Sequence, residues 1–547
     1  MATNPSCVRA IPYQASEDVD DKSISMCLYL YTYGKGIPAE LRKASEDMFV
    51  DYKLEYFDLN ERAPLGEFVA PRFCNNPSEI KEMANLAAII ENNLPLFENR
   101  LNVTAVQPSY KISSSREEDE LCVTVYVLGK GRIPVGEKKF SEKEHLENSN
   151  YRFNIVEGYF VPTGSSDSLP FIYGARPLHF GVGIGVAGKD DAGTLGVFLK
   201  DEDDNKYILS CEHVLGKGAP EKVKIVQPAE EDSRSAEKEL SKKIEENKVE
   251  IIKNEQWMQG ALDQRERDRL SNGINMRNIL VTLNEEQRRD AVSRDIATYS
   301  DGLRENWEYE GQKIFVDVAV AHLNPEVAEE ITWKTNKKGT VFGFNEEKSI
   351  NGKIIDLCTF KEDNKEIAFW KSGRSTGHTE GGRLCYRNCF LQKEGHGSLS
   401  SCFGKLEHCN FMVYCESCAK KEKSDLVDVS LLEDEDRKCT ECKKTIPKEK
   451  KALRLWARNC FIILNPNGPF SDSGDSGAVI FDDEGNAWGI IIGTFRSGHF
   501  IHTVAIPLDI AIKALNDKSK KKFSILYSKR DDPKASESLP SCWSAFS

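Results

Sequence analysis

The sequence has no hydrophobic run that approaches the roughly 20 residues needed to cross a membrane as a helix. Its first residues contain no basic segment followed by an apolar one, so no secretory signal peptide is predicted. Positive charge is not in excess either: the formal net charge is −13, which argues against nucleic-acid binding. We therefore expect a cytoplasmic protein with no membrane or nucleic-acid partner.

Disulfides are also not expected, although the chain contains 16 cysteines. In a chain without an export signal, cysteines are more often free thiols or metal ligands. The 547 residues exceed what one hydrophobic core usually supports. Two or more domains are therefore expected.

The segment 468–481 contains a candidate nucleophile. It reads as a loop entering a strand, because small and polar residues precede the apolar run from Ala478 to Phe481. Within it, Ser476 follows Gly474 and Asp475 and precedes Gly477. The backbone N–H groups of Gly474 and Ser476 are the candidate oxyanion hole. An ordinary turn has the same residue types, so a base and a carboxylate must come from elsewhere.

Two apolar segments supply them. Residues 207–215 read as a buried strand that ends at His213, and residues 314–321 read as a strand with one aspartate, Asp317. A buried carboxylate without a partner is costly, so Asp317 should have one. The chain order is histidine, aspartate, serine, which differs from subtilisin and the α/β-hydrolases. Asp356 is the main rival for the acid.

As a set, these motifs resemble the trypsin-like, chymotrypsin-fold serine peptidases, and most closely an intracellular branch of that family. The resemblance covers about residues 171–520, with two interruptions, and each motif is weak alone. Further segments that match the family are 180–185, 193–199, 371–381, 489–493 and 504–515.

This resemblance implies a mainly β fold, a chymotrypsin-like double β-barrel, and a serine endopeptidase that acts on proteins or peptides. His213, Asp317 and Ser476 would form the catalytic triad. Secreted members pair the aspartate of their Gly-Asp-Ser-Gly motif with a newly cut N-terminus. No activation-cleavage sequence precedes Phe180, so Asp475 needs another partner or has none. Phe470, expected at the base of the substrate pocket, argues against a preference for lysine or arginine.

Residues 229–300 interrupt the family pattern with a segment dense in charged residues. Apolar residues at helical spacing predict two helices, the second beginning at an N-cap near Asn284. Such an insert is either a solvated helical hairpin or an arm that docks a protein partner.

A second insert, residues 383–455, predicts a metal site. Two Cys-x-x-Cys pairs, Cys415 with Cys418 and Cys439 with Cys442, have the spacing of one structural zinc site in a zinc-ribbon-like insert. Reduced thiols are the alternative. Further cysteines and histidines upstream leave a second site open: Cys385, Cys389, Cys402, Cys409, His396 and His408.

Residues 1–170 precede the protease-like region and predict a small α+β domain that has an internal repeat. Residues 27–38 match residues 122–134, with a helix expected over 77–96 between them. The predicted domains are 1–170, 171–525 and a disordered tail, 526–547. Beside the endopeptidase, two functions stay open: a latent or degenerate protease that acts as a protein-binding scaffold, and a zinc-ribbon adaptor or nucleic-acid binder.

Overall fold

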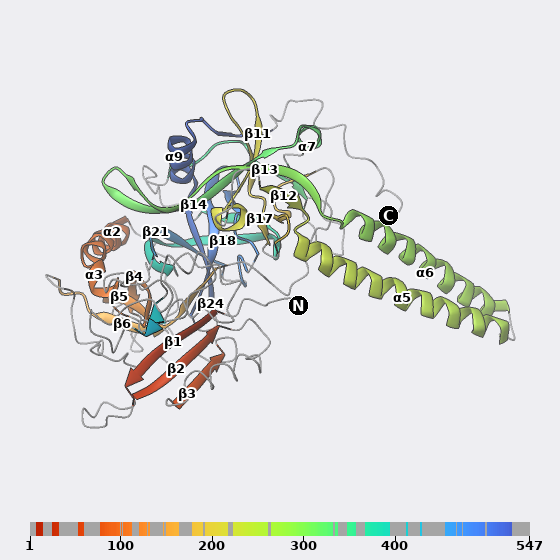
Figure 1. Ribbon diagram of the computed structural model, residues 1–547, viewed down its shortest axis with the longest axis horizontal. Coiled ribbons are helices and arrows are strands. Elements are labelled where there is room, and N and C mark those ends of the chain that lie inside the picture. The colour runs from red at the N-terminus through yellow and green to blue at the C-terminus, as the bar shows by residue number, and fades with distance from the viewer. Residues whose placement is uncertain are drawn as a thin grey trace. The chain divides into compact units, whose positions relative to one another are not determined.

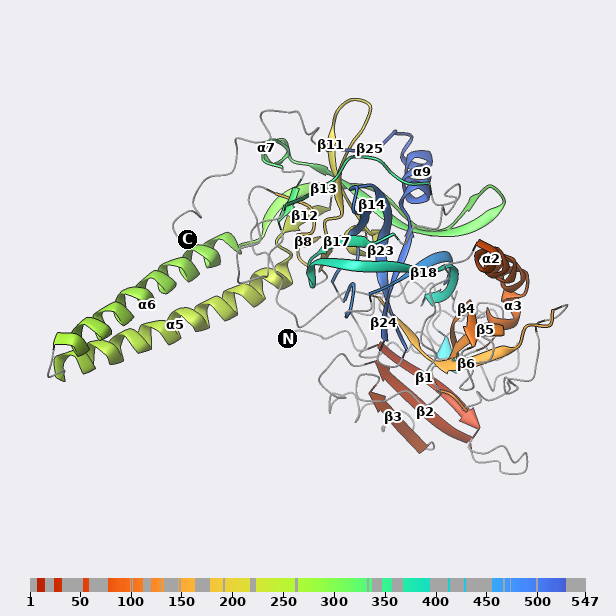
Figure 2. The ribbon, with the colours of Figure 1, turned by 180° about the vertical axis from the view of Figure 1, so that it is seen from behind.

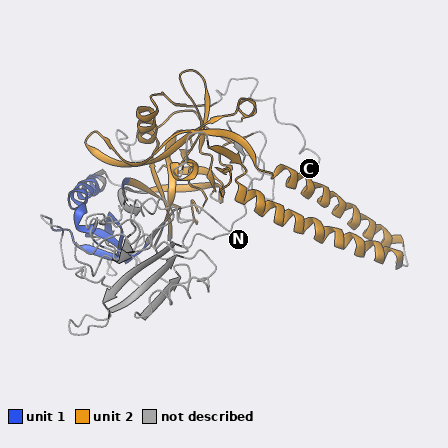
Figure 3. Ribbon diagram, viewed as in Figure 1, with its two compact units in different colours: residues 1–160, 386–459, 495–500 blue, residues 161–385, 460–494, 501–547 orange. Residues whose placement is uncertain are grey.

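The computed structural model shows a chain that divides into two compact units (Figure 3). Unit 1 comprises residues 1–160, 386–459 and 495–500, and unit 2 comprises residues 161–385, 460–494 and 501–547. The structure describes residues 7–14, 24–31, 53–58, 77–98, 100, 102–111, 120–127, 129–131, 146, 149–162, 178–189, 192–216, 223–260, 264–331, 334–336, 347–356, 367–393, 412–413, 427–428, 455–465, 468–472, 474–497 and 500–527.

One β-sheet of unit 2 has the strand order β25-β10-β11-β14-β13-β12-β8-β9 and is antiparallel throughout. Its long strand β14 is buried over eight consecutive residues, as the apolar run around Asp317 predicts. The strands are β8 (Gly183–Val186), β9 (Ala192–Thr194), β10 (Val197–Lys200), β11 (Lys206–Ser210), β12 (Lys224–Gln227), β13 (Arg294–Tyr309), β14 (Gln312–Leu323) and β25 (Ser524–Ile525).

Among the described residues, a second sheet has ten strands, and six of them follow in the order β17-β22-β23-β24-β21-β18. These six are β17 (Phe369–Gly373), β18 (Gly377–Lys393), β21 (Leu455–Leu464), β22 (Val479–Asp482), β23 (Ala487–Ser497) and β24 (Phe500–Pro507). Aromatic and aliphatic side chains fill its core, among them Phe369, Phe461, Phe470, Trp488 and Ile491. Helix α9 (Leu508–Ser519) follows β24 and packs its apolar face on β13 and β14.

Two long helices, α5 (Glu230–Gly260) and α6 (Gln264–Asp290), form a hairpin that extends away from the first sheet (Figures 1 and 2). We call this hairpin the arm. At its root, Ala236 and Leu240 pack against Ala291. The prediction of an N-cap near Asn284 is wrong, because that residue lies inside α6. Contacts with α5, such as the ion pair between Lys248 and Glu285, extend the helix through this polar stretch.

Unit 1 contains helices α2 (Pro77–Asn92) and α3 (Leu94–Glu98) and strands β4 (Val103–Lys111), β5 (Glu120–Val127) and β6 (Phe153–Glu157). The apolar face of α2 contacts β4 and β5 and shares one core with them. Strand β18, which runs from unit 2 into unit 1, pairs with β4 at Phe390 and Leu391.

The predicted internal repeat coincides with a repeated strand arrangement in unit 1. In the three-stranded sheet of β1 (Cys7–Gln14), β2 (Ile24–Tyr31) and β3 (Lys53–Asp58), the middle strand is antiparallel to β1 and parallel to β3. Strand β5 is likewise antiparallel to β4 and parallel to β6. The two matching sequence segments therefore begin in middle strands of the same type.

Shorter elements complete the described residues: β7 (Tyr159–Pro162), α4 (Glu212–Leu215), α7 (Pro325–Glu329) and the strand pairs β15 (Lys334–Asn336) with β16 (Glu347–Ser349) and β19 (Met412–Val413) with β20 (Val427–Asp428). No helix among the described residues is long and apolar enough to span a membrane. Residues 528–547 lie outside the described residues.

The structure confirms a mainly β fold with several antiparallel sheets. Closure of the two sheets into barrels, the domain boundaries and the zinc-ribbon-like insert stay predictions. The predicted zinc ligands Cys415, Cys418, Cys439 and Cys442, and the upstream Cys402, Cys409, His396 and His408, lie outside the described residues.

Candidate active site

His213 is positioned by the end of β11 and the short helix α4. Ser210, the last residue of β11, pairs with Ala319 of β14, which places the following turn beside Asp317. The backbone N–H of His213 donates to Oδ1 of Asp317 at 3.1 Å, and Nδ1 of His213 lies 2.9 Å from Oδ2. Both carboxylate oxygens therefore hold the same histidine, one through its backbone and one through its ring.

Asp317 is fully buried and receives a third contact from the neighbouring strand. Arg304 of β13 lies opposite Asp317 in the register, and its Nε is 3.4 Å from Oδ2 of Asp317. A carboxylate that faces several donors is stabilised in its charged form. Asp317, not the rival Asp356, contacts the histidine; Asp356 lies 3.9 Å from Lys513 of α9.

Glu212, next to the histidine, is a second acid at this site. Burial raises the pKa of Glu212 to about 7, although the Tyr299 hydroxyl donates a hydrogen bond to its Oε2 at 3.0 Å. Near neutral pH this side chain therefore exchanges a proton. The nearby negative charge of Asp317 also contributes to the raised pKa of Glu212.

Ser476 lies in a tight turn whose two glycines are required by the backbone. Gly474 and Gly477 have φ values of 98° and 96°, in the left-handed region that favours glycine. A Cβ atom on Gly477 would collide with the Ser210 hydroxyl. The motif around Ser476 therefore has a conformational cause as well as a chemical one.

One backbone carbonyl joins the serine turn to the histidine turn. The oxygen of Ile491, on β23, accepts the backbone N–H of Gly477 at 2.8 Å and the thiol of Cys211 at 3.2 Å. Thr194 adds a further link, because its N–H donates to the Ser476 carbonyl at 2.8 Å and its hydroxyl donates to the Gly474 carbonyl at 2.9 Å. These contacts bring the three predicted residues to one region of unit 2.

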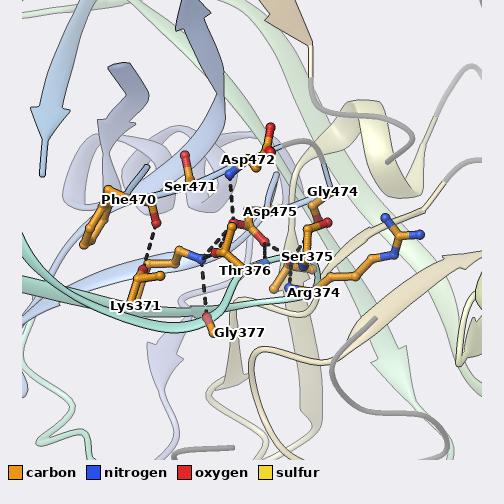
Figure 4. A network of polar contacts seen from close by, with 12 residues as sticks. Lys371, Arg374, Ser375, Thr376, Gly377, Phe470, Ser471, Asp472, Gly474 and Asp475 are labelled. Atoms are coloured by element: carbon orange, nitrogen blue, oxygen red, sulfur yellow. Dashed lines mark hydrogen bonds and ion pairs between the residues drawn. The ribbon is translucent and has the colours of Figure 1, made fainter. Parts of the chain in front are cut away.

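Asp475 is held by the ammonium group of Lys371, and both side chains are completely buried (Figure 4). The Lys371 Nζ lies 2.7 Å from Oδ2 of Asp475. Backbone N–H groups of Asp472, Ser375 and Thr376 and the Thr376 hydroxyl also donate to this carboxylate. Asp475 therefore has an internal partner, which the sequence did not identify.

The environment of this pair favours its ionised form. Burial by itself raises the pKa of Asp475, but the Lys371 ammonium and the hydrogen bonds outweigh burial and hold the pKa below its ordinary value. Burial lowers the pKa of Lys371, and Asp475 opposes that shift. The charged pair thus fixes the residue immediately before Ser476.

A second buried ion pair connects the serine turn to the root of the arm. The Nε atom of Arg374 lies 2.9 Å from both carboxylate oxygens of Asp232, on the first turn of α5. The backbone N–H of Arg374 donates to the Thr194 hydroxyl at 3.0 Å, and that hydroxyl in turn contacts Gly474. Sequence reasoning missed both members of this pair.

The residue expected at the base of the substrate pocket lies in the core. Phe470 is completely buried in the second sheet, and its carbonyl accepts the Thr379 hydroxyl at 2.8 Å. Beside it, the hydroxyl oxygens of Ser471 and Thr503 are 2.6 Å apart. Its place in the pocket and the substrate preference drawn from it stay predictions.

Three side chains of the site also form a group that could hold a metal ion. The ligand atoms of Cys211, His213 and Asp317 all lie within 4.8 Å of one another. In this arrangement the thiol contacts the Ile491 carbonyl, and Nδ1 contacts the carboxylate. The contact between Nδ1 and the carboxylate is the one that a histidine–aspartate pair makes in acid–base chemistry.

No family model matches the chain, and no curated protein matches it. Among solved structures it is similar to the Nocardiopsis protease NAPase, at 8% sequence identity and a TM-score of 0.27. That match covers 64% of this chain and 99% of the protease.

Replacing Lys371 with methionine should reduce the free energy of unfolding by about 3–5 kcal/mol, because Asp475 would be left as a buried charge without its cation. Urea denaturation measures this loss. Lys348→Met is the control: Lys348 makes its ion pairs at the surface, with Glu380 and Asp483, and its removal should cost less than about 1 kcal/mol. Equal effects of the two substitutions would contradict a special role for the buried pair.

The contribution of Asp475 to stability should depend on pH. Its pKa is lower in the folded state than the ordinary value of 3.8, so its ionisation stabilises the fold above that value. The contribution is lost as the pH falls through the folded pKa. The difference in unfolding free energy between wild type and Asp475→Asn should therefore shrink on acidification below about pH 4. Asp483→Asn, at an exposed position, supplies the baseline; a difference that stays constant with pH argues against the assignment.

Proposed function

We propose that the protein is a cytoplasmic, trypsin-like serine endopeptidase that hydrolyses peptide bonds in proteins or peptides. Ser476 attacks the scissile carbonyl, and His213 accepts the serine proton and passes it to the leaving amine. Asp317 orients the imidazole and stabilises its protonated form. The proton starts on the serine hydroxyl and ends on the amine as the carbon–nitrogen bond breaks.

The observation that carries the proposal is the double contact between His213 and Asp317. Because Nδ1 faces the carboxylate, the proton of the neutral ring belongs on Nδ1, and Nε2 is then the basic atom. The backbone contact to Oδ1 fixes the backbone of His213 beside the same carboxylate. A surface histidine used only for structure has no need of a fully buried carboxylate held by Arg304 as well.

The Lys371–Asp475 pair supports the second requirement, an ordered oxyanion hole formed by the N–H groups of Gly474 and Ser476. Those groups stabilise the developing oxyanion only if the turn is fixed before reaction. In the secreted proteases that the sequence resembles, a newly cut N-terminus supplies the ammonium group. Here the ammonium group belongs to Lys371. On this proposal, the uncut chain is competent.

A specific observation favours a second candidate, the latent or degenerate protease that serves as a protein-binding scaffold. Ser476 is completely buried, and His213 is 7% exposed. A substrate reaches the hydroxyl only after the covering residues move. A latent protein retains the same hydrogen bonds but never opens, so reactivity of the serine separates the two candidates. For the zinc-ribbon adaptor or nucleic-acid binder, the net charge of −13 is unfavourable.

A fluorophosphonate probe should label the purified, uncut protein at Ser476. His213→Ala should reduce the labelling rate by at least about a thousandfold, because the serine loses its base. Mass spectrometry of the labelled peptide locates the adduct, and His322→Ala is the matched control at a histidine near the far end of β14. A folded wild-type protein that never labels favours the scaffold, and labelling that survives His213→Ala removes the triad assignment.

We also propose that Cys415, Cys418, Cys439 and Cys442 bind one structural zinc ion. The spacing of the two cysteine pairs supports this, and four thiolates complete a tetrahedral zinc site without an open position.

Metal analysis should therefore find at least one zinc ion per chain. The double substitution Cys439→Ser and Cys442→Ser should remove one zinc ion, whereas Cys122→Ser, at a buried cysteine of β5, should leave the zinc content unchanged. Full zinc content in the double variant would show that the ligands are wrong.

A further inference from the structure

The arm has its polar and apolar residues in an unusual distribution. The contacts between the two helices include charged and amide groups: Arg277 of α6 lies 3.7 Å from Glu250 and 3.4 Å from the Asn247 amide oxygen, both on α5. Meanwhile large apolar side chains of the arm lie exposed. In a solvated hairpin the large apolar residues normally lie between the helices and not on the outer faces.

The exposed apolar residues of α6 form one stripe. Met276, Ile279, Leu280 and Leu283 are 57%, 47%, 40% and 42% exposed. They follow the spacing i, i+3, i+4 and i+7, which places them on one face of a helix. Four large apolar side chains aligned in this way are characteristic of a helix face that packs against another protein surface.

The hairpin does not need this stripe for its own fold. The buried apolar residues of the arm are Ala236, Leu240, Ile244, Leu270 and, just beyond α6, Ala291. None of them belongs to the stripe, and the ion pairs between α5 and α6 use residues of α6 outside it. The stripe is therefore available to a partner without any change in the arm.

Charged residues at the two ends of the stripe identify that partner. Arg269, Met276, Leu283 and Asp290 are spaced seven residues apart, so they lie along the same face. The centre of the stripe falls between Ile279 and Leu280, at position 279.5. Arg269 and Asp290 are equally far from it, because 279.5 − 269 and 290 − 279.5 are both 10.5.

Because of this symmetry, the face is complementary to an identical face that runs in the opposite direction. In an antiparallel pair of identical helices, Met276 faces Leu283 and Ile279 faces Leu280. At each end, Arg269 of one helix faces Asp290 of the other. In a parallel pair, each arginine would face an arginine and each aspartate an aspartate, which is repulsive. In the antiparallel pair, Asn272 of one helix likewise faces Gln287 of the other, and both side chains are neutral.

We propose that α6 packs antiparallel against α6 of a second copy of this chain, forming a two-fold symmetric dimer. The contact is isologous: the same face of both molecules is used, and each charge pair occurs twice. Arg269 and Asp290 are 21 residues apart, so the seam is about 31 Å long at 1.5 Å per residue. The proposal is independent of the catalytic function, since it rests on α6 alone.

Charge exchange tests both the dimer and its direction. Analytical ultracentrifugation of the full chain should show a wild-type dimer at micromolar concentration. Arg269→Asp and Asp290→Arg should each weaken association on the order of tenfold, because each variant places like charges at both ends of the seam. An equimolar mixture of the two variants, and the double variant, should both recover wild-type affinity, because antiparallel pairing then restores both attractive pairs. The double variant reports the direction: in a parallel dimer it would keep like charges at both ends, as the wild type would.

A matched pair of substitutions on one turn tests the stripe itself. Ile279→Glu should give a monomer at all concentrations, whereas Thr282→Glu, exposed on another face of α6, should leave the dimer intact. Circular dichroism should show unchanged helix content in both. A wild-type protein that stays monomeric to tens of micromolar overturns the proposal, as does a mixture of charge variants that does not regain affinity. Equal behaviour of the two glutamate variants also overturns it.

Discussion

The buried ion pair between Lys371 and Asp475 is the constraint on which the geometry of the candidate site depends. Neither charge is tolerable in the interior without the other, and the pair is completed by the backbone N–H groups of Ser375 and Thr376. Because Asp475 directly precedes Ser476, fixing its carboxylate also fixes the turn that presents the serine. The strand β17 and the following turn therefore act as a template for a loop about a hundred residues later in the chain.

The rest of the site is built by bringing two sheets of unit 2 together at the ends of their strands. The eight-stranded sheet supplies His213 and Asp317, and the second sheet supplies Ser476 and Lys371. Their alignment relies on backbone groups, chiefly the Ile491 carbonyl, which accepts from both the histidine turn and the serine turn. Backbone contacts of this kind do not depend on side-chain identity, so conservative substitutions of Cys211 neighbours or of Ile491 would leave the backbone part of this link in place.

A functional residue could be predicted from the sequence when its signal lies within a few neighbouring residues. His213, Asp317 and Ser476 each stand out within a few residues, as a polar group in or beside an apolar run, and the mainly β class was implied by the family resemblance that these motifs carry together. Lys371 and Asp232 could not be found in this way. Lys371 lies among Phe369 and Trp370 and resembles an ordinary strand residue until its distant partner is known, and Asp232 is one acid among many in a highly charged segment. Only the tertiary pairing shows which of these charges are buried. The error at Asn284 has the same origin, because packing against α5 overrode a local start signal.

The arm is joined to the serine turn by the same kind of interaction that fixes the turn itself. A buried pair such as Asp232–Arg374 adds little net stability, because its desolvation cost offsets much of its attraction. Its geometry admits few arrangements, so the pair orients the start of α5 relative to Arg374. The first turn of α5 is therefore fixed in position beside Thr194 and Gly474, rather than attached through a flexible linker. Because α5 is one uninterrupted helix, fixing its first turn also fixes the direction of its axis. The chain thus uses a buried acid paired with a basic residue twice: Lys371–Asp475 orders the turn of the candidate nucleophile, and Arg374–Asp232 fixes the start of the arm.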